Sequence, residues 1–158
     1  MNNGNANFEL VTINSALMEK QVVDEILACN EETKQYGLVL NEKQALALAQ
    51  TRTSALKENK RIEFKGGIVE KLIISFEDSP YISQDNFESI LHELIDLFYE
   101  IKNSTWDMIS DKDLIEFMKA AFNNECCGPV ELLSGQVMRL SEHIHRGGNI
   151  KEFKLREN

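Results

Sequence analysis

His92 and Glu93 match the first half of the helix motif of zinc proteases. In that motif, H-E-x-x-H, two histidines one helical turn apart bind zinc and the glutamate acts as the base. Residue 96, where the second histidine belongs, is Asp. Asp can also bind zinc, but the spacing identifies no third ligand. A metalloprotein that uses His92 and Asp96 is therefore one hypothesis, and a chance His-Glu pair on a core helix is the simpler one.

Helical periodicity divides this stretch into two faces. At about 100° per residue, the apolar side chains between residues 87 and 101 gather on one side, whereas His92, Asp96 and Tyr99 lie almost opposite. Carboxylates one turn away on either side favour protonated His92, and an imidazolium does not bind metal. We interpret these three residues as a charged outer face, with a partner-binding surface that includes Tyr99 as the alternative.

The cysteines and the remaining histidines form no recognisable metal or catalytic pattern. Zinc thiolates are usually separated by two to four residues, whereas Cys126 and Cys127 are adjacent and should point apart. His143 and His145 are separated by about 200° on a helix. We therefore predict no catalytic residue and no metal ligand, and the sequence leaves the role of the two cysteines open.

Arg52 falls in the middle of the apolar stripe of a predicted helix. A buried charge must be paired or must line a cavity, because burying it alone is very costly. Glu63 is one possible partner, and a buried salt bridge is the simpler interpretation. The alternative is a pocket for an anion or small molecule, in which Arg52 and the following segment take part. Its candidate ligand-binding residues are Arg52, Arg61, Glu63, Gly66 and Gly67.

Composition indicates one acidic globular domain. The chain has 158 residues, a net charge of −9, and only 2 Pro and 8 Gly. An acidic body repels nucleic-acid phosphates, so no nucleic-acid partner is expected. No apolar run is long enough to span a bilayer, and the N-terminus lacks the pattern of a secretory signal. We predict a cytoplasmic protein with no cofactor and no membrane association.

Periodicity and capping signals predict an all-α bundle of about six helices with short connections. The expected helices cover residues 15–29, 42–58, 67–77, 84–103, 111–122 and 135–146, the last preceded by a short turn at 129–133. Asn41 with Gln44, Ser83 and Ser110 are the expected N-caps. The lone Trp106 is interpreted as a packing anchor at a helix junction.

The alternative fold is a small α+β domain in which "FELVTI" (8–13), "RIEF" (61–64) and "KEFKL" (151–155) pair as short strands. In either case we expect a flexible N-terminus at 1–7, a single helical domain at 8–146 and a basic C-terminal tail at 147–158.

Several stretches together resemble a known family. They are "TRTSALKENKRIEFKGGIVEKLI", "DSPYISQDNFESILHELIDLFY", "SDKDLIEFMKAAF" and "GPVELLSG". With these, residues 8–146 are similar to a family of small proteins of unknown function from Gram-positive anaerobic bacteria. The resemblance implies a bacterial, single-domain protein and brings no catalytic residues with it.

The leading functional hypothesis is a non-enzymatic helical interaction or accessory protein that binds a protein partner or itself. It is motivated by amphipathic helices that can present a groove and by the lack of a complete catalytic pattern. The alternative is the small-molecule or anion-binding protein, possibly an enzyme, with its pocket around Arg52 and residues 61–67.

Overall fold

Helices form all the regular structure in the computed structural model, which describes residues 3–63 and 67–153. The α-helices are α1 (Asn3–Ala28), α2 (Asn30–Thr33), α3 (Glu42–Glu58), α4 (Ile68–Phe76), α5 (Phe87–Ser104), α6 (Asp111–Ala120) and α7 (Val130–His145). Short 3₁₀ turns cover 34–36 and 150–152, and a π-helical segment continues α6 over 121–126. The prediction of an all-α single domain with six main helices is confirmed. None of the described helices is both long enough and apolar enough to cross a membrane.

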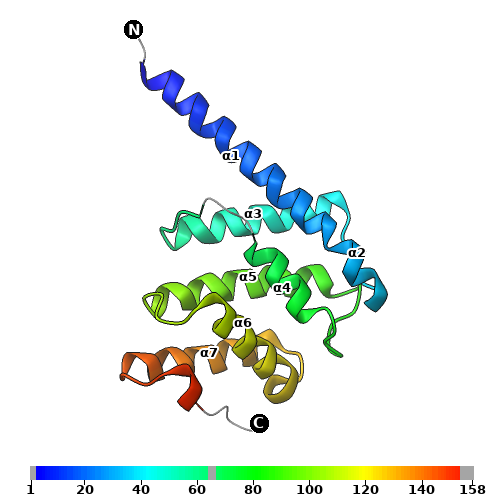
Figure 1. Cartoon of the computed structure of the whole chain (residues 1–158), viewed down its shortest axis with the longest axis vertical. Coiled ribbons are helices and arrows are strands. Elements are labelled where there is room, and N and C mark those ends of the chain that lie inside the picture. Colours follow the sequence, from blue (N-terminus) through cyan, green and yellow to red (C-terminus); the bar gives the residue numbers. More distant parts are fainter. Residues whose placement is uncertain (1–2, 64–66, 154–158) are drawn as a thin grey trace.

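The helices form two layers. The long helices α3, α5 and α7 lie side by side and run in the same direction, and the shorter α4 and α6 return across them (Figure 1). α1 crosses the body at the side of α3. α5 is the central element because it packs against α3, α4, α6 and α7. More than half of its circumference is therefore buried, and it supplies Phe87, Phe98 and Tyr99, which are among the largest enclosed side chains.

Local sequence signals explain where several helices begin. The Asn41 side chain accepts a hydrogen bond from the Gln44 amide at 2.8 Å, and the Asn41 amide donates to the Gln44 side-chain oxygen at 2.9 Å, as predicted. Ser110 caps α6 by accepting from the Asp113 amide, also as predicted. The predicted cap at Ser83 is wrong, because α5 begins only at Phe87.

The start of α5 was misplaced because Ser83 is part of a turn. Its amide donates to the Asn86 side chain at 2.7 Å, which closes a local loop in place of a helical turn. The expected break at 134–135 is also wrong. α7 runs unbroken through these residues because its apolar face is continuous, with Leu133, Val137 and Leu140 all buried.

The N-terminal segment differs most from the expectation. Residues 8–13 were the strand alternative, but they lie within α1, which starts at Asn3 and so includes most of the segment expected to be flexible. The other two proposed strands are not formed either. Residues 61–63 have no regular structure, and residues 151 and 152 belong to a 3₁₀ turn. Phe64 and residues 154–155 lie outside the described residues.

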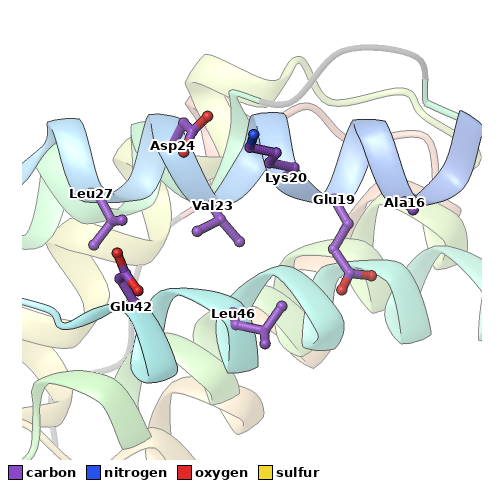
Figure 2. A pocket seen from close by; sticks show the side chains of 8 residues that line it. All are labelled: Ala16, Glu19, Lys20, Val23, Asp24, Leu27, Glu42 and Leu46. Carbon is purple, nitrogen blue, oxygen red and sulfur yellow. The ribbon is translucent and has the colours of Figure 1, made fainter.

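A groove separates the C-terminal half of α1 from α3. Its volume is about 390 Å³, and it is lined by Ala16, Glu19, Lys20, Val23, Asp24, Leu27, Glu42 and Leu46. Val23 and Leu46 point toward each other across it (Figure 2). Leu46 remains 41% exposed, so the groove offers apolar surface at its floor.

Replacing Asn41 with Ala tests the capping box. The substitution removes the acceptor for the Gln44 amide, so we expect the free energy of unfolding to fall by about 1 kcal/mol. Chemical denaturation followed by circular dichroism measures this difference. Gln50→Ala, an exposed change on the same helix, is the control and should leave stability within about 0.5 kcal/mol. Equal stability of the two variants would contradict the assignment.

Candidate binding face at the ends of α3 and α5

The C-terminus of α3 is closed by a Schellman motif. The Lys60 amide donates to the Lys57 carbonyl at 3.1 Å, and the Arg61 amide donates to the Leu56 carbonyl at 2.8 Å. This pair of bonds requires the residue after the cap to adopt the left-handed conformation, which normally selects glycine. Here that residue is Lys60, with φ of 55°.

α5 ends in the same motif. The Trp106 amide donates to the Asn103 carbonyl at 3.2 Å, and the Asp107 amide donates to the Lys102 carbonyl at 2.9 Å. The left-handed position is occupied by Trp106, with φ of 52°, and Asp107 follows with φ of 58°. Two consecutive non-glycine residues are thus held in a conformation that side chains disfavour.

Two other helical segments use glycine for this position, although Cys127, with φ of 55°, ends the π-helical segment in the same conformation. Gly37 and Gly147 close the same pair of hydrogen bonds with φ of 76° and 87°. A side chain in the left-handed region costs roughly 1–2 kcal/mol per residue relative to the right-handed one. Such strain persists only where surrounding contacts impose it, and it gathers at functional sites. The strained pair of loops, 59–63 and 105–109, is therefore our candidate site.

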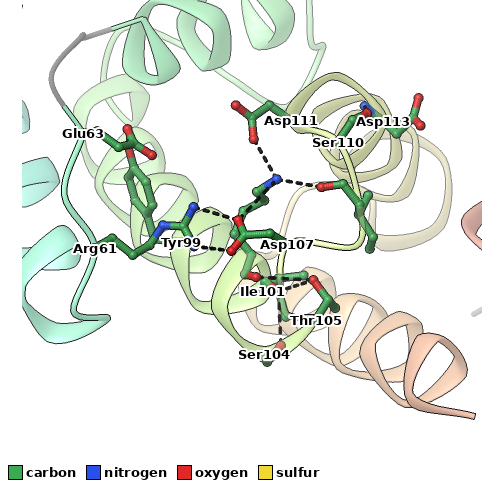
Figure 3. A network of polar contacts seen from close by, with 12 residues as sticks. Arg61, Glu63, Tyr99, Ile101, Ser104, Thr105, Asp107, Ser110, Asp111 and Asp113 are labelled. Carbon is green, nitrogen blue, oxygen red and sulfur yellow. Dashed lines mark hydrogen bonds and ion pairs between the residues drawn. The ribbon is translucent and has the colours of Figure 1, made fainter.

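An ion pair joins the two loops. Arg61 donates to both carboxylate oxygens of Asp107, Nη1 to Oδ2 at 3.0 Å and Nη2 to Oδ1 at 2.7 Å (Figure 3). Each is the residue that follows the left-handed position, one at the end of α3 and the other at the end of α5. The hydrogen bonds from Arg61, together with its charge and that of Lys102, lower the pKa of Asp107. A planar two-bond contact of this kind fixes orientation as well as distance.

Lys102 supports the same loop from beneath. Its side chain is buried, and Nζ donates to the Ile109 carbonyl at 2.6 Å and lies 2.9 Å from Asp111 Oδ1. Nζ also lies 3.7 Å from Asp107 Oδ1. One buried cation thus holds the loop at its middle, at its end and at the first turn of α6.

A second buried cluster holds the other loop. Arg52 of α3 lies 3.6 Å from Glu63, measured from Nη2 to Oε2, and Tyr99 of α5 donates its hydroxyl to the same Glu63 oxygen at 2.8 Å. Arg52 is only 4% exposed and Tyr99 is fully buried. Burial and the neighbouring Glu63 raise the pKa of Tyr99, so the phenol stays protonated as the donor.

This anchoring turns apolar side chains outward. Ile62 lies between the two anchored residues of its loop and is 81% exposed, while Trp106 and Met108, on either side of Asp107, are 69% and 63% exposed. One face of Trp106 stacks on His145 at the end of α7, with ring centroids 4.6 Å apart. We call Ile62, Trp106 and Met108 the loop face. The usual arrangement is partly reversed here, because Arg52 and Lys102 are buried while apolar residues meet solvent.

The five residues predicted to bind a ligand do not all meet. Arg52 and Glu63 come together as the salt bridge, whereas Arg61 pairs with Asp107. Gly67 supplies the left-handed backbone, φ of 109°, that starts α4, and Gly66 lies outside the described residues. The groove of Figure 2 is lined by none of the five. The geometry favours the salt-bridge interpretation of Arg52.

The predicted partner surface on α5 needs correction. Asp96 is exposed, but Tyr99 is fully buried, and His92 is half-buried because it contacts Thr51 of α3 at 2.6 Å and Glu88 at 2.9 Å. The flank of α5 that carries His92 and Tyr99 faces α3 and not solvent. A central helix has neighbours on several sides, which a two-face division cannot anticipate.

The remaining candidates are separated in space. Cys126 is buried and Cys127 is exposed, so their thiols lie on opposite sides of the backbone. His143 contacts the Asn149 carbonyl, whereas His145 contacts the Ser104 carbonyl. Among the residues that the structure describes, no three His, Cys, Asp or Glu side chains are grouped closely enough to hold a metal ion.

Sequence reasoning missed Lys102, Asp107 and the exposure of Trp106. A signal existed for Lys102, which lies four residues after Phe98 and so falls on the apolar stripe of α5, as Arg52 does on α3. Asp107 gave no signal, because its partner is 46 residues away. Trp106 does lie at a helix junction, but it is exposed, so the prediction that it anchors packing is wrong.

The chain belongs to a family that is defined by sequence. The chain matches the model of a family of unknown function, DUF6323, over residues 25–150, and it is a member of that family. The matched range covers both loops and all three residues of the loop face. Curated proteins and solved structures gave no match to the chain.

Replacing Glu63 with Gln tests the buried cluster. The variant removes the Glu63 carboxylate from beside the buried Arg52 charge, so we expect a loss of about 2 kcal/mol in the free energy of unfolding, measured by chemical denaturation. Glu116→Gln, an exposed change on α6, is the matched control and should have little effect. If the two variants are equally stable, Glu63 does not hold its loop.

Acid should weaken the ion pair between the loops. The pKa of Asp107 lies below its ordinary value of 3.8, so its contribution is present above that value and is lost as the pH falls through the lowered pKa. We expect Asp107→Asn to lose about 1 kcal/mol of stability at neutral pH, a figure that allows for solvent screening. As the pH falls below 3.8 through this lowered pKa, the difference from the native chain should shrink. A difference that stays constant with pH would contradict the assignment.

Proposed function

We propose that this protein is a non-enzymatic helical interaction module that binds a protein partner through the loop face. One observation carries the proposal: a tryptophan occupies the glycine position of a Schellman motif and is exposed there. Trp106 is costly in this place for folding, because glycine would close the same hydrogen bonds without strain. An exposed tryptophan is also the side chain that most often dominates protein interfaces.

The neighbours of Trp106 support the same role. Ile62 and Met108 are the other large apolar side chains exposed on the two loops, and the Arg61–Asp107 ion pair fixes the loops to each other. A face that is already ordered loses little entropy when a partner binds. The partner should offer an apolar pocket for the indole and a basic rim, because the chain carries a net charge of −9.

The setting we propose is the cytoplasm of a Gram-positive anaerobic bacterium. This rests on the sequence resemblance and on three free cysteines at 29, 126 and 127. Burial raises the pKa of Cys29 to about 12, so that thiol stays protonated and unreactive. The alternative, a ligand pocket around Arg52, has less support because the guanidinium is buried against Glu63.

Trp106→Gly separates binding from folding. Glycine relieves the left-handed strain while the contact with His145 is lost, so the free energy of unfolding should stay within about 1 kcal/mol of the native value. Affinity purification of the tagged chain from its native cells identifies the partner, and titration then compares variants. We expect the dissociation constant to rise at least 30-fold, or about 2 kcal/mol.

The lone tryptophan also reports binding directly. A partner that covers Trp106 should shift its emission to the blue and protect it from a soluble quencher. Met138→Ala removes a comparably exposed apolar side chain from α7, 49% exposed, and should bind normally. A partner that binds the native chain and Trp106→Gly equally well would exclude the loop face as its site.

A further inference from the structure

We infer that the groove between α1 and α3 binds an amphipathic helix of a protein partner, with Lys or Arg at both ends of the apolar stripe of that helix. This site is separate from the loop face. Glu42 and Leu46, which line the groove, lie in the first two turns of α3, whereas the loop face follows the C-terminus of the same helix. The two ends of α3 are about 24 Å apart, so the two sites can be tested independently.

The floor of the groove is apolar and partly open to solvent. Val23 and Leu27 of α1 pack on the core but stay only half-buried, and Leu46 of α3 is 41% exposed. Val23 and Leu46 point toward each other, so both helices contribute to one apolar patch (Figure 2). A volume of about 390 Å³ accepts a few side chains of an incoming segment, whose backbone then rests on the rim.

The rim of the groove is acidic and its charges are unpaired. Glu19, Asp24 and Glu42 line the groove together with a single cation, Lys20. None of these four side chains forms an ion pair or a hydrogen bond with another part of the chain that the structure describes. Glu42 and Glu19 lie at the two ends of the apolar patch (Figure 2). A cation at each end of an apolar stripe would therefore meet an unpaired carboxylate.

The walls of the groove select a helix over an extended segment. Both walls are α-helices, whose backbone N–H and C=O groups are already bonded within each helix, so no strand can add to them. The lining residues of α1 run from Ala16 to Leu27, which is about 16 Å along the helix axis. Three turns of a partner helix match this length and place apolar side chains at helical spacing over the floor.

Charge decides which of the possible occupants fits the groove. Nucleic acids and acidic lipid surfaces carry phosphates, which the rim carboxylates repel. A second copy of this chain brings a net charge of −9 and is disfavoured for the same reason. A basic helix instead gains an ion pair at each end of its apolar contact, and the acidic chain attracts it before contact.

Fluorescence anisotropy with two synthetic peptides tests the site on the full chain. The first is a labelled peptide of about 12 residues, or three turns, with leucines along one helical face and lysines at both ends of that face. The second carries glutamates in place of the lysines. We expect the lysine peptide to bind at least about 10-fold more tightly than the glutamate peptide. Circular dichroism should show that the lysine peptide becomes helical when it binds.

Charge reversal locates the bound peptide. Glu19→Lys combined with Glu42→Lys should weaken the lysine peptide at least about 10-fold and should strengthen binding of the glutamate peptide. Glu116→Lys combined with Glu131→Lys is the matched control, because it makes the same change in net charge at exposed positions of α6 and α7. Glu131 also lies in the first turn of its helix, as Glu42 does. The control should change either affinity by less than about 3-fold.

Two further variants separate the floor from the loop face. Leu46→Ala should weaken the lysine peptide at least about 5-fold by removing apolar contact, whereas Trp106→Gly should bind it normally. Equal binding by the native chain and the charge-reversed groove variant, or a loss in Trp106→Gly alone, would overturn the inference. So would a native chain that sediments as a dimer and dissociates on Leu46→Ala, because a second copy would then occupy the groove.

Discussion

The ion pair between Arg61 and Asp107 is the contact on which the candidate face depends. It joins the residues that immediately follow two strained left-handed positions, one at the end of α3 and the other at the end of α5. The helices themselves already pack through their apolar sides. The ion pair fixes the position and orientation of the helix ends, which apolar packing alone does not determine. Lys102 beneath Asp107, and Arg52 beneath Glu63, extend this restraint into the interior.

The energetics of the two loops favour a functional interpretation. Buried cations cost desolvation energy, and side chains at left-handed positions cost conformational energy. A loop built only for stability would carry glycine at positions 60 and 106, as the chain does at 37 and 147. Instead, hydrogen bonds and ion pairs hold the two loops in a conformation that exposes three apolar side chains to solvent. Stability is reduced in return for exposed surface, a compromise that is common at binding sites.

Sequence reasoning recovered what depends on local pattern. It gave the bounds of α3, the caps at Asn41 and Ser110, the burial of Arg52 and its possible partner Glu63. It failed where the outcome depends on tertiary packing. The helical state of residues 8–13, for example, contradicts the strand that the alternative α+β fold placed there.

The candidate site shows the same limit more sharply. Helical phase places Tyr99 almost opposite the apolar stripe of α5, and only the position of α3 decides that it is buried. Arg61 and Asp107 are 46 residues apart, and no spacing rule connects them. The left-handed conformation of Trp106 contradicts the rule that assigns such positions to glycine, so a correct application of that rule excludes it.

The common direction of α3, α5 and α7 gives the molecule an electrical polarity. α3, α5 and α7 place their C-terminal ends, each with a partial negative charge, on one side of the molecule, whereas the returning helices α4 and α6 offset part of the summed dipole. That side is the end of the molecule that carries the loop face. In the field of a basic partner, the protein should therefore turn this end forward before contact, which raises the fraction of encounters that are productive. Added salt should slow association by screening this effect, while the apolar contact, once formed, should persist.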